Sequence, residues 1–374
     1  MKQTLKFGRI AGIPVGVHWS ALVIMVLLAQ SLVVGVLPAS VPDLPWTVAW
    51  LLGVGGAALF LLSLFAHEAA HALVARGFGI RVERLTLWLL GGVAEFRDEP
   101  PSARADFLVA IAGPLTSFAA GVGFGTVALL VSGLDGPPAV VATAGWLAMI
   151  NLVVAVFNLL PGAPLDGGRV LRAALWWWRG DRTRAALTAT RTGRWLGIAL
   201  LFAGLAELLV FGALSGIWLG LLGWFVLAAA IAEGVTARTR AILDDTPVRA
   251  VMRTGAVCGE PGQSVESFVP VAAGSRQRWF PLCDDAGHPT GMVGLTALVD
   301  VPATARAATT LQQVAGPATR VDAGQAVATV VLPGPTRSAV VVDDGRLVGV
   351  LSSDDIARAV EVARLHAPAG DRAR

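Results

Sequence analysis

The chain has 374 residues, of which 55% are hydrophobic and only 15% charged, and its mean hydropathy is +0.67. These values exclude an ordinary soluble enzyme and indicate a membrane protein. The net charge of +3 does not indicate nucleic-acid binding, because the basic residues are scattered in loops that flank apolar runs. Since the long apolar runs end near residue 236, we expect a membrane domain over 1–236, a linker over 237–247 and a soluble module beyond it.

Six apolar stretches are expected to cross the bilayer as helices, over residues 17–37, 46–74, 107–131, 140–160, 196–211 and 217–235. The first lacks a convincing cleavage site, so we interpret it as a retained span and not as a signal peptide. The loops at 38–45 and 133–138 contain no Lys or Arg, whereas arginines follow the second, fourth and sixth spans. The positive-inside rule therefore predicts that both termini and the soluble module are cytoplasmic.

Two segments of this half are not regular spans. Residues 82–96 are too short to cross and contain Gly91-Gly92, which predicts a hairpin or re-entrant element whose backbone must be covered by protein or water. Residues 169–194 combine arginines with Trp176-Trp177-Trp178, a composition typical of an amphipathic segment at the lipid boundary. Glu207 is an intramembrane acid near the non-basic end of its span, and no role is assigned to it.

The second span carries a candidate metal motif, His67-Glu68-x-x-His71, near its basic end. Two histidines four residues apart lie on one face of a helix and can reach one zinc ion, with Glu68 beside them as a candidate general base. Ionisable groups at membrane depth are costly, so their presence indicates a metal or a polar cavity. The alternative is a cluster that only caps and hydrates the end of a helix.

A hydrolytic zinc site needs a third protein ligand. Position 77 is glycine, which excludes the local third histidine of metzincins, while His18 opens the first span and His288 and His366 lie in the soluble module. Asp166 is a better candidate, because it lies in a segment broken by Gly and Pro at the basic end of the fourth span. The alternative is a helix-terminal turn, for which Asp-Gly-Gly is well suited.

Together, His67-Glu68-x-x-His71 and Asn158-x-x-Pro161-x-x-x-Leu165-Asp166-Gly167-Gly168 strongly resemble the two-part motif of the site-2 protease family of intramembrane zinc metalloproteases. The resemblance covers the whole membrane half, including six spans, the hairpin at Gly91-Gly92 and Gly113-Pro114 in the third span. It implies an α-helical polytopic membrane domain with a re-entrant β-hairpin.

The resemblance also implies the roles of the site residues and the substrate. His67, His71 and Asp166 would hold one zinc ion, Glu68 would act as general base, and Asn158 would lie near the substrate or the oxyanion. The substrate would be a transmembrane protein that is cut within the bilayer toward the cytoplasmic face, in regulated intramembrane proteolysis. Because a helix shields its own peptide bonds, we expect the substrate to unwind and pair as a strand with the hairpin at 82–96.

The soluble module contains an internal repeat of strand, Asp and Gly turn, strand and helix, at 278–293 and again at 338–351. It resembles a tandem cystathionine-β-synthase-type (CBS) pair, with α/β copies expected at 248–300 and 301–374, a module that often binds adenine nucleotides. Ser352-x-x-Asp355 matches the ribose-contacting pattern, whereas Gly294 and Ala297 replace it in the first copy, so at most one site is intact. The alternative is a structural pair that forms a homodimer. The two cysteines, Cys258 and Cys283, fit a reducing compartment.

Two other functions remain open on the sequence. A membrane metal transporter or sensor gated by the CBS pair would need metal ligands but no general base, so Glu68 discriminates it from a protease. An inactive scaffold would have no need of His67, Glu68, His71 and Asp166 together. The sequence therefore favours an intramembrane zinc endopeptidase.

Overall fold

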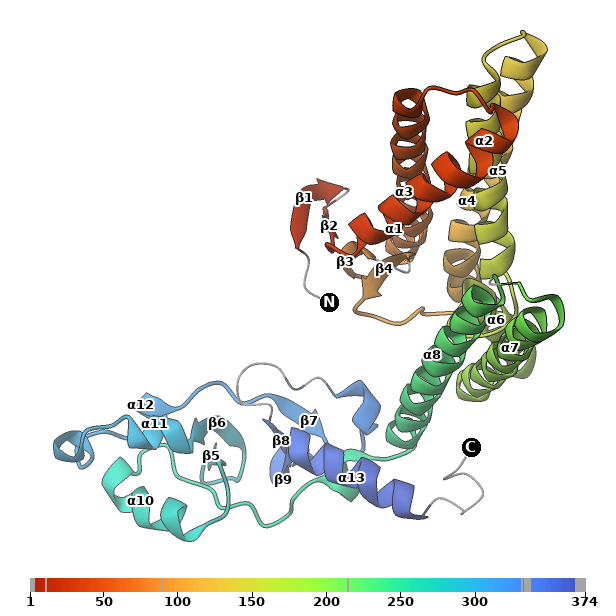
Figure 1. Ribbon diagram of the computed structural model, residues 1–374. Helices are drawn as coiled ribbons and strands as arrows, with labels where there is room; N and C mark the ends of the chain where they lie inside the picture. The colour runs from red at the N-terminus through yellow and green to blue at the C-terminus, as the bar shows by residue number, and fades with distance from the viewer. Residues whose placement is uncertain are drawn as a thin grey trace. The chain divides into compact units, whose positions relative to one another are not determined.

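The computed structural model describes residues 4–10, 12–88, 91–213, 215–330, 332 and 338–366. The chain divides into two compact units, Met1–Val235 and Thr236–Arg374, and each is described by itself. Helices dominate the first unit, coloured red to green in Figure 1, and short strands and helices make up the second.

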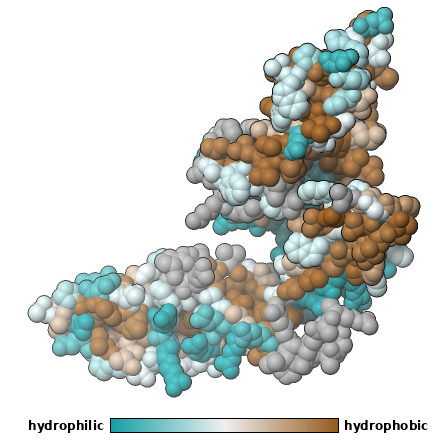
Figure 2. Space-filling view, viewed as in Figure 1, coloured by the Kyte–Doolittle hydropathy of each residue, from teal (hydrophilic) through white to brown (hydrophobic). Residues whose placement is uncertain are grey.

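Six helical segments among the described residues are long and apolar enough to cross a membrane, as the sequence predicted. They are Ala21–Ser40, which joins α1 (Ala21–Gln30), the π-helical η1 (Ser31–Val36) and α2 (Leu37–Ser40), and then α3 (Trp46–Gly77), α4 (Ala103–Gly133), α5 (Pro138–Asn158), α7 (Arg182–Phe211) and α8 (Ser215–Asp244). Their outward side chains are strongly apolar, and Leu129 and Phe211 are 76% and 79% exposed. Figure 2 shows hydrophobic residues gathered over these helices, a surface suited to lipid.

Three predicted boundaries differ from those of the structure. The first spanning helix begins at Ala21 and not at Val17, because Val17 ends a strand. The basic segment 169–194 is divided between the short amphipathic helix α6 (Asp166–Arg179) and the first turns of α7. Finally, α8 continues to Asp244, through most of the range 237–247 that was expected to be a linker.

A four-stranded sheet lies beside α3. It contains β1 (Leu5–Ile10), β2 (Ile13–Val17), β3 (Val82–Trp88) and β4 (Gly91–Phe96) in that order. Strands β3 and β4 pair antiparallel, with Leu85 opposite Ala94, while β2 pairs parallel with β3. The sequence predicted the β3–β4 hairpin but not β1 and β2. Ile13, Val15 and Leu85 pack on Ala72 of α3, which fixes the sheet next to the second histidine of the metal motif.

The second unit contains the repeated order of strand, turn, strand and helix. The first occurrence is β5 (Trp279–Cys283), β6 (Pro289–Gly294) and α11 (Leu295–Val299), and the second is β8 (Ser338–Asp343), β9 (Arg346–Ser352) and α13 (Ser353–His366). The other elements are α9 (Val248–Val251), α10 (Val265–Gly274), η2 (Ala303–Ala305), α12 (Leu311–Val314), β7 (Arg320–Asp322) and η3 (Val327–Thr329). Each occurrence packs on its own core, one around Phe268 and Phe280 and the other around Val341 and Leu351.

Candidate metal centre

Helix α3 presents His67 and His71 on one face, as their spacing of four residues requires. Both side chains are buried, with 2% and 4% exposure. Their rings meet edge to face with centroids 4.9 Å apart, and the two Nε2 atoms are 3.3 Å apart. The helix therefore aims both Nε2 lone pairs at one point.

Asp166, the first residue of α6, completes the cluster from across the bundle. Its Oδ2 atom lies 3.2 Å from Nε2 of His67 and 3.2 Å from Nε2 of His71. Two glycines permit this approach: a Cβ on Gly167 would lie 2.3 Å from the carbonyl oxygens of Leu159 and Leu160, and one on Gly168 would lie 2.3 Å from the nitrogen of Ala163. The Asp-Gly-Gly sequence thus lets the start of α6 sit directly on the preceding turn.

The three donor atoms fit a zinc ion. A tetrahedral ion with bonds of about 2.1 Å holds its ligands about 3.4 Å apart, and the separations here are 3.3, 3.2 and 3.2 Å. Two imidazole nitrogens and one carboxylate oxygen are also ligands that zinc prefers. Burial raises the pKa of Asp166, but the hydrogen bonds of His67 and His71, and their charge when protonated, outweigh burial and hold that pKa below its ordinary value.

Helix α4 orients both histidines through their other ring nitrogens. Nδ1–H of His71 donates to the backbone carbonyl of Val109 at 2.6 Å, and Nδ1 of His67 is hydrogen-bonded to the buried hydroxyl of Ser117 at 2.9 Å. Because Nδ1 of His71 must carry the proton, its Nε2 atom carries a free lone pair in the neutral ring. This lone pair faces the Asp166 carboxylate, an arrangement of acceptors that becomes favourable when a cation or a proton lies among them.

Two glycines leave space for the centre, and the sequence had not assigned this role to them. A Cβ on Gly113 of α4 would lie 2.2 Å from Nε2 of His71 and 2.5 Å from Nε2 of His67. A Cβ on Gly92 of β4 would lie 2.0 Å from Cγ of Glu68. The hairpin therefore covers Glu68 closely, and α4 borders the volume between the histidines.

Asn158 and the polar residues that were rejected or left without a role have contacts of their own. The Asn158 amide donates to the carbonyl of Val154 at 3.1 Å within α5, so its approach to a substrate stays a prediction. His18 is hydrogen-bonded to Ser20 at 2.8 Å, and His288 lies 3.4 Å from Asp284. Glu207 accepts from the hydroxyl of Ser215 at 2.5 Å.

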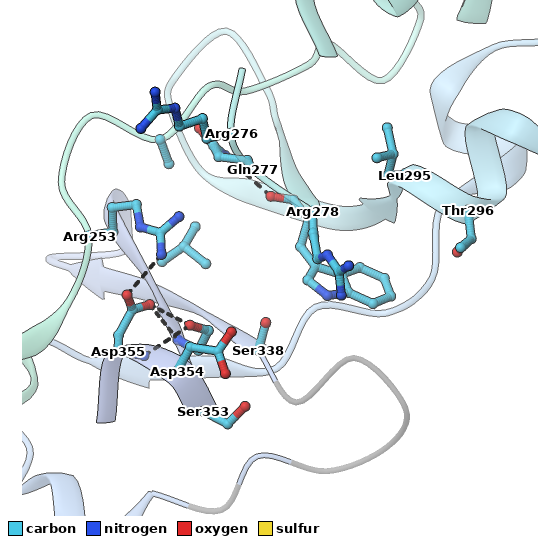
Figure 3. Close-up of a pocket in the computed structure, with 14 residues that line it drawn as sticks. Arg253, Arg276, Gln277, Arg278, Leu295, Thr296, Ser338, Ser353, Asp354 and Asp355 are labelled. Atoms are coloured by element: carbon cyan, nitrogen blue, oxygen red, sulfur yellow. Dashed lines mark hydrogen bonds and ion pairs between the residues drawn. The ribbon is translucent and has the colours of Figure 1, made fainter. Parts of the chain in front are cut away.

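The second unit contains a cavity of about 630 Å³ at the predicted nucleotide pattern. The Ser352 hydroxyl donates to one carboxylate oxygen of Asp355 at 2.5 Å. Arg253 donates to the other carboxylate oxygen at 2.9 Å (Figure 3). Arg276 and Arg278 also line the cavity, so it presents three cationic side chains. In the first repeat Gly294 occupies the position that Ser352 has in the second. The ring of Trp279 packs on this glycine, and a Cβ there would lie 2.4 Å from the ring.

The sequence matches two known families. Residues 55–140 and 136–204 match Peptidase family M50, and residues 333–362 match the CBS domain. The first of these matches covers the helices that carry the metal centre, and the second covers β8, β9 and most of α13.

Curated relatives match over nearly the whole chain. A Mycobacterium tuberculosis protein named "Putative zinc metalloprotease Rip3" is 41% identical over 98% of this chain and 95% of its own length. A zinc metalloprotease of Methanocaldococcus jannaschii is 27% identical over 98% of both chains. Among solved structures, the site-2 protease of Methanocaldococcus jannaschii is 29% identical and covers 62% of this chain and 94% of that one, with a TM-score of 0.41.

Proposed function

The chain belongs to peptidase family M50, the site-2 proteases, and we propose that His67, His71 and Asp166 bind the zinc ion on which its peptidase activity depends. As a member of this family it is an intramembrane zinc metalloprotease, embedded in lipid and acting on membrane proteins. The observation that carries the ligand assignment is the set of three donor separations of 3.2 to 3.3 Å.

The chain's own residues supply the proton transfers. Zinc, when bound, lowers the pKa of a coordinated water toward about 7 and polarises the scissile carbonyl. Glu68 lies on the turn of α3 between the two histidines, where its carboxylate can take a proton from the attacking water. The same carboxyl then donates this proton to the leaving amine nitrogen. Asn158 would donate to the carbonyl oxygen as negative charge develops there, once its amide leaves the carbonyl of Val154.

The hairpin supports a role in holding the substrate. Strand β4 is an edge of the four-stranded sheet, and Gly92 on that strand lies against Glu68. A substrate segment that unwinds and pairs with this edge would bring its backbone carbonyl next to the general base. This placement requires the hairpin to lie at membrane depth, where the neighbouring helices cover its backbone.

Glu68→Gln tests the proposed chemistry. The amide keeps the size and shape of the carboxylate but cannot act as a base at neutral pH, so cleavage of a single-span substrate should be lost while zinc content stays at one ion per chain. A transporter, which the family assignment disfavours, would be indifferent to this change. Cleavage at the wild-type rate would remove Glu68 from the mechanism.

The arginine-lined cavity of the second unit supports binding of an adenine nucleotide at Ser352 and Asp355. The carboxylate of Asp355 suits the two ribose hydroxyls, and Arg253, Arg276 and Arg278 suit the phosphates. Because Trp279 packs on Gly294 in the first repeat, one nucleotide per chain is expected. The second candidate role of this unit is to join two chains as a homodimer.

Calorimetric titration of the full chain in detergent with ATP, ADP and AMP separates these roles. A nucleotide site predicts binding heat with a stoichiometry of one nucleotide per chain. Asp355→Asn should reduce the nucleotide affinity, because it weakens the contact to the ribose. No heat with any of the three, together with a dimer mass from light scattering, would favour the dimerising role.

A further inference from the structure

One stripe of α4 contains four residues near the metal centre, of which three contact its histidines. Asp106, Val109, Gly113 and Ser117 follow one another at intervals of three and four residues, so they lie on one face of the helix. Val109 and Ser117 orient the two histidines, and Gly113 borders both Nε2 atoms. The fourth member of the stripe, Asp106, touches neither histidine in the hydrogen bonds described above and has a different partner.

Asp106 is fully buried, with 0% exposure, and it binds α6. The Arg172 guanidinium donates to both carboxylate oxygens, at 2.8 and 2.7 Å, and Arg169 adds a longer contact at 3.4 Å. Both arginine side chains are largely shielded, with about one fifth of their surface exposed. Burying such a pair costs solvation of both ions, so its net stabilisation is small unless the geometry is as good as this bidentate one.

Arg172 shares a rigid helix with the carboxylate of the metal centre. It follows Asp166 by six residues on α6, which corresponds to about 9 Å along the helix axis. The glycine contacts at the start of α6 join that helix to the turn at 159–163. The pair of Asp106 and Arg172 instead joins α6 to α4, the helix that orients the histidines.

We propose that Asp106 and Arg172 are positioning residues, which hold α6 in the rotation and height that place the Asp166 carboxylate against the two histidines. This inference rests on the proposed role of Asp166 as a ligand. Displacing α6 by a fraction of an ångström takes Oδ2 outside the tolerance of a metal bond, which is about 0.2 Å. The pair therefore acts on zinc affinity and on the geometry of the bound ion.

The test uses the full chain in detergent, loaded with Zn²⁺ for affinity and with Co²⁺ for its visible spectrum. Asp106→Asn should lower zinc affinity by about 10-fold or more, the lower limit of what loss of a direct outer contact to a metal ligand costs, and weaken the Co²⁺ absorption bands. Asp106→Glu keeps the charges and the hydrogen bonds but lengthens the connection by one methylene. It should stay folded and still lower the affinity and shift the bands.

Asp181→Asn is the matched control, because it removes the charge from an exposed pair with Arg184 while keeping an N-cap side chain. It should leave both signals unchanged. A purely structural pair predicts a lower unfolding temperature in Asp106→Asn with wild-type zinc affinity and Co²⁺ spectrum in both Asp106 variants, and that result would overturn the inference. Asp166→Ala tests the underlying ligand role separately. If that variant also keeps wild-type zinc affinity and spectrum, the proposed role of Asp166 as a zinc ligand is wrong, independently of Asp106.

Discussion

Gly113→Ala should weaken zinc binding by at least about 100-fold without removing any polar group. The added methyl carbon would lie 2.2 Å from Nε2 of His71 and 2.5 Å from Nε2 of His67, whereas unbonded carbon contacts are comfortable at about 3.5 Å. Each nitrogen would have to retreat by about 1 Å, several times the tolerance of a metal bond. Since loss of one outer contact already costs about 10- to 100-fold in affinity, we expect at least the upper limit, about 2.7 kcal/mol.

Competition with a chromophoric chelator measures this loss directly on the purified full chain. Gly123→Ala is the matched control, because it makes the same substitution on the same helix at a position with no neighbouring atom within 4 Å. It should keep one zinc per chain and wild-type affinity. If Gly113→Ala also bound one zinc with wild-type affinity, the donor set deduced from the Nε2 atoms would be incorrect.

Three further predictions concern the general base, a histidine partner and the membrane topology. Gly92→Ala should keep its zinc but lose turnover, because the new Cβ would lie 2.0 Å from Cγ of Glu68; loss of zinc in this variant would contradict the separation of base and ligands. Ser117→Ala should lower zinc affinity by about 10-fold or more, since His67 loses its Nδ1 partner. Chelator competition measures this loss, and competition at the same chelator concentration as in the wild type would contradict the prediction. For topology, Leu134→Cys lies in an exposed loop without basic residues, and in a variant that lacks both native cysteines a membrane-impermeant maleimide should label it in intact cells. In the wild-type chain the same reagent should label the exposed Cys258 only after permeabilisation.

The three proposed ligands were accessible to sequence reasoning because their chemistry is unusual for their surroundings. His67 and His71 have helical spacing inside an apolar run, and Asp166 interrupts another at the same depth, so each is costly unless it has a function. The six helices were predicted for a related reason, since a span needs only length and hydropathy. The resemblance to the site-2 proteases added the pairing of the two motifs.

Other features depend on contacts between distant segments and were therefore missed. Strand β2 pairs with β3, and no strand was predicted before the first span because no local pattern predicts a partner about seventy residues away. Gly113 and Ser117 are small residues in an apolar helix, where they are equally typical of ordinary close packing. Asn158 was singled out by its sequence motif, but its amide donates to the carbonyl of Val154 and not toward the metal centre, because a motif does not determine a rotamer.

The stripe on α4 shows why packing and chemistry are difficult to separate in this family member. Lipid is as apolar as a leucine side chain, so helices in a membrane associate through small residues and polar contacts and not through the hydrophobic effect. The buried face of α4 follows this rule with Ala110, Gly113 and Ser117. The same close approach brings its backbone and hydroxyl within hydrogen-bonding distance of both histidines. Substitutions on this face should therefore impair zinc binding before they impair assembly of the helices, because metal bonds tolerate smaller displacements than side-chain packing does.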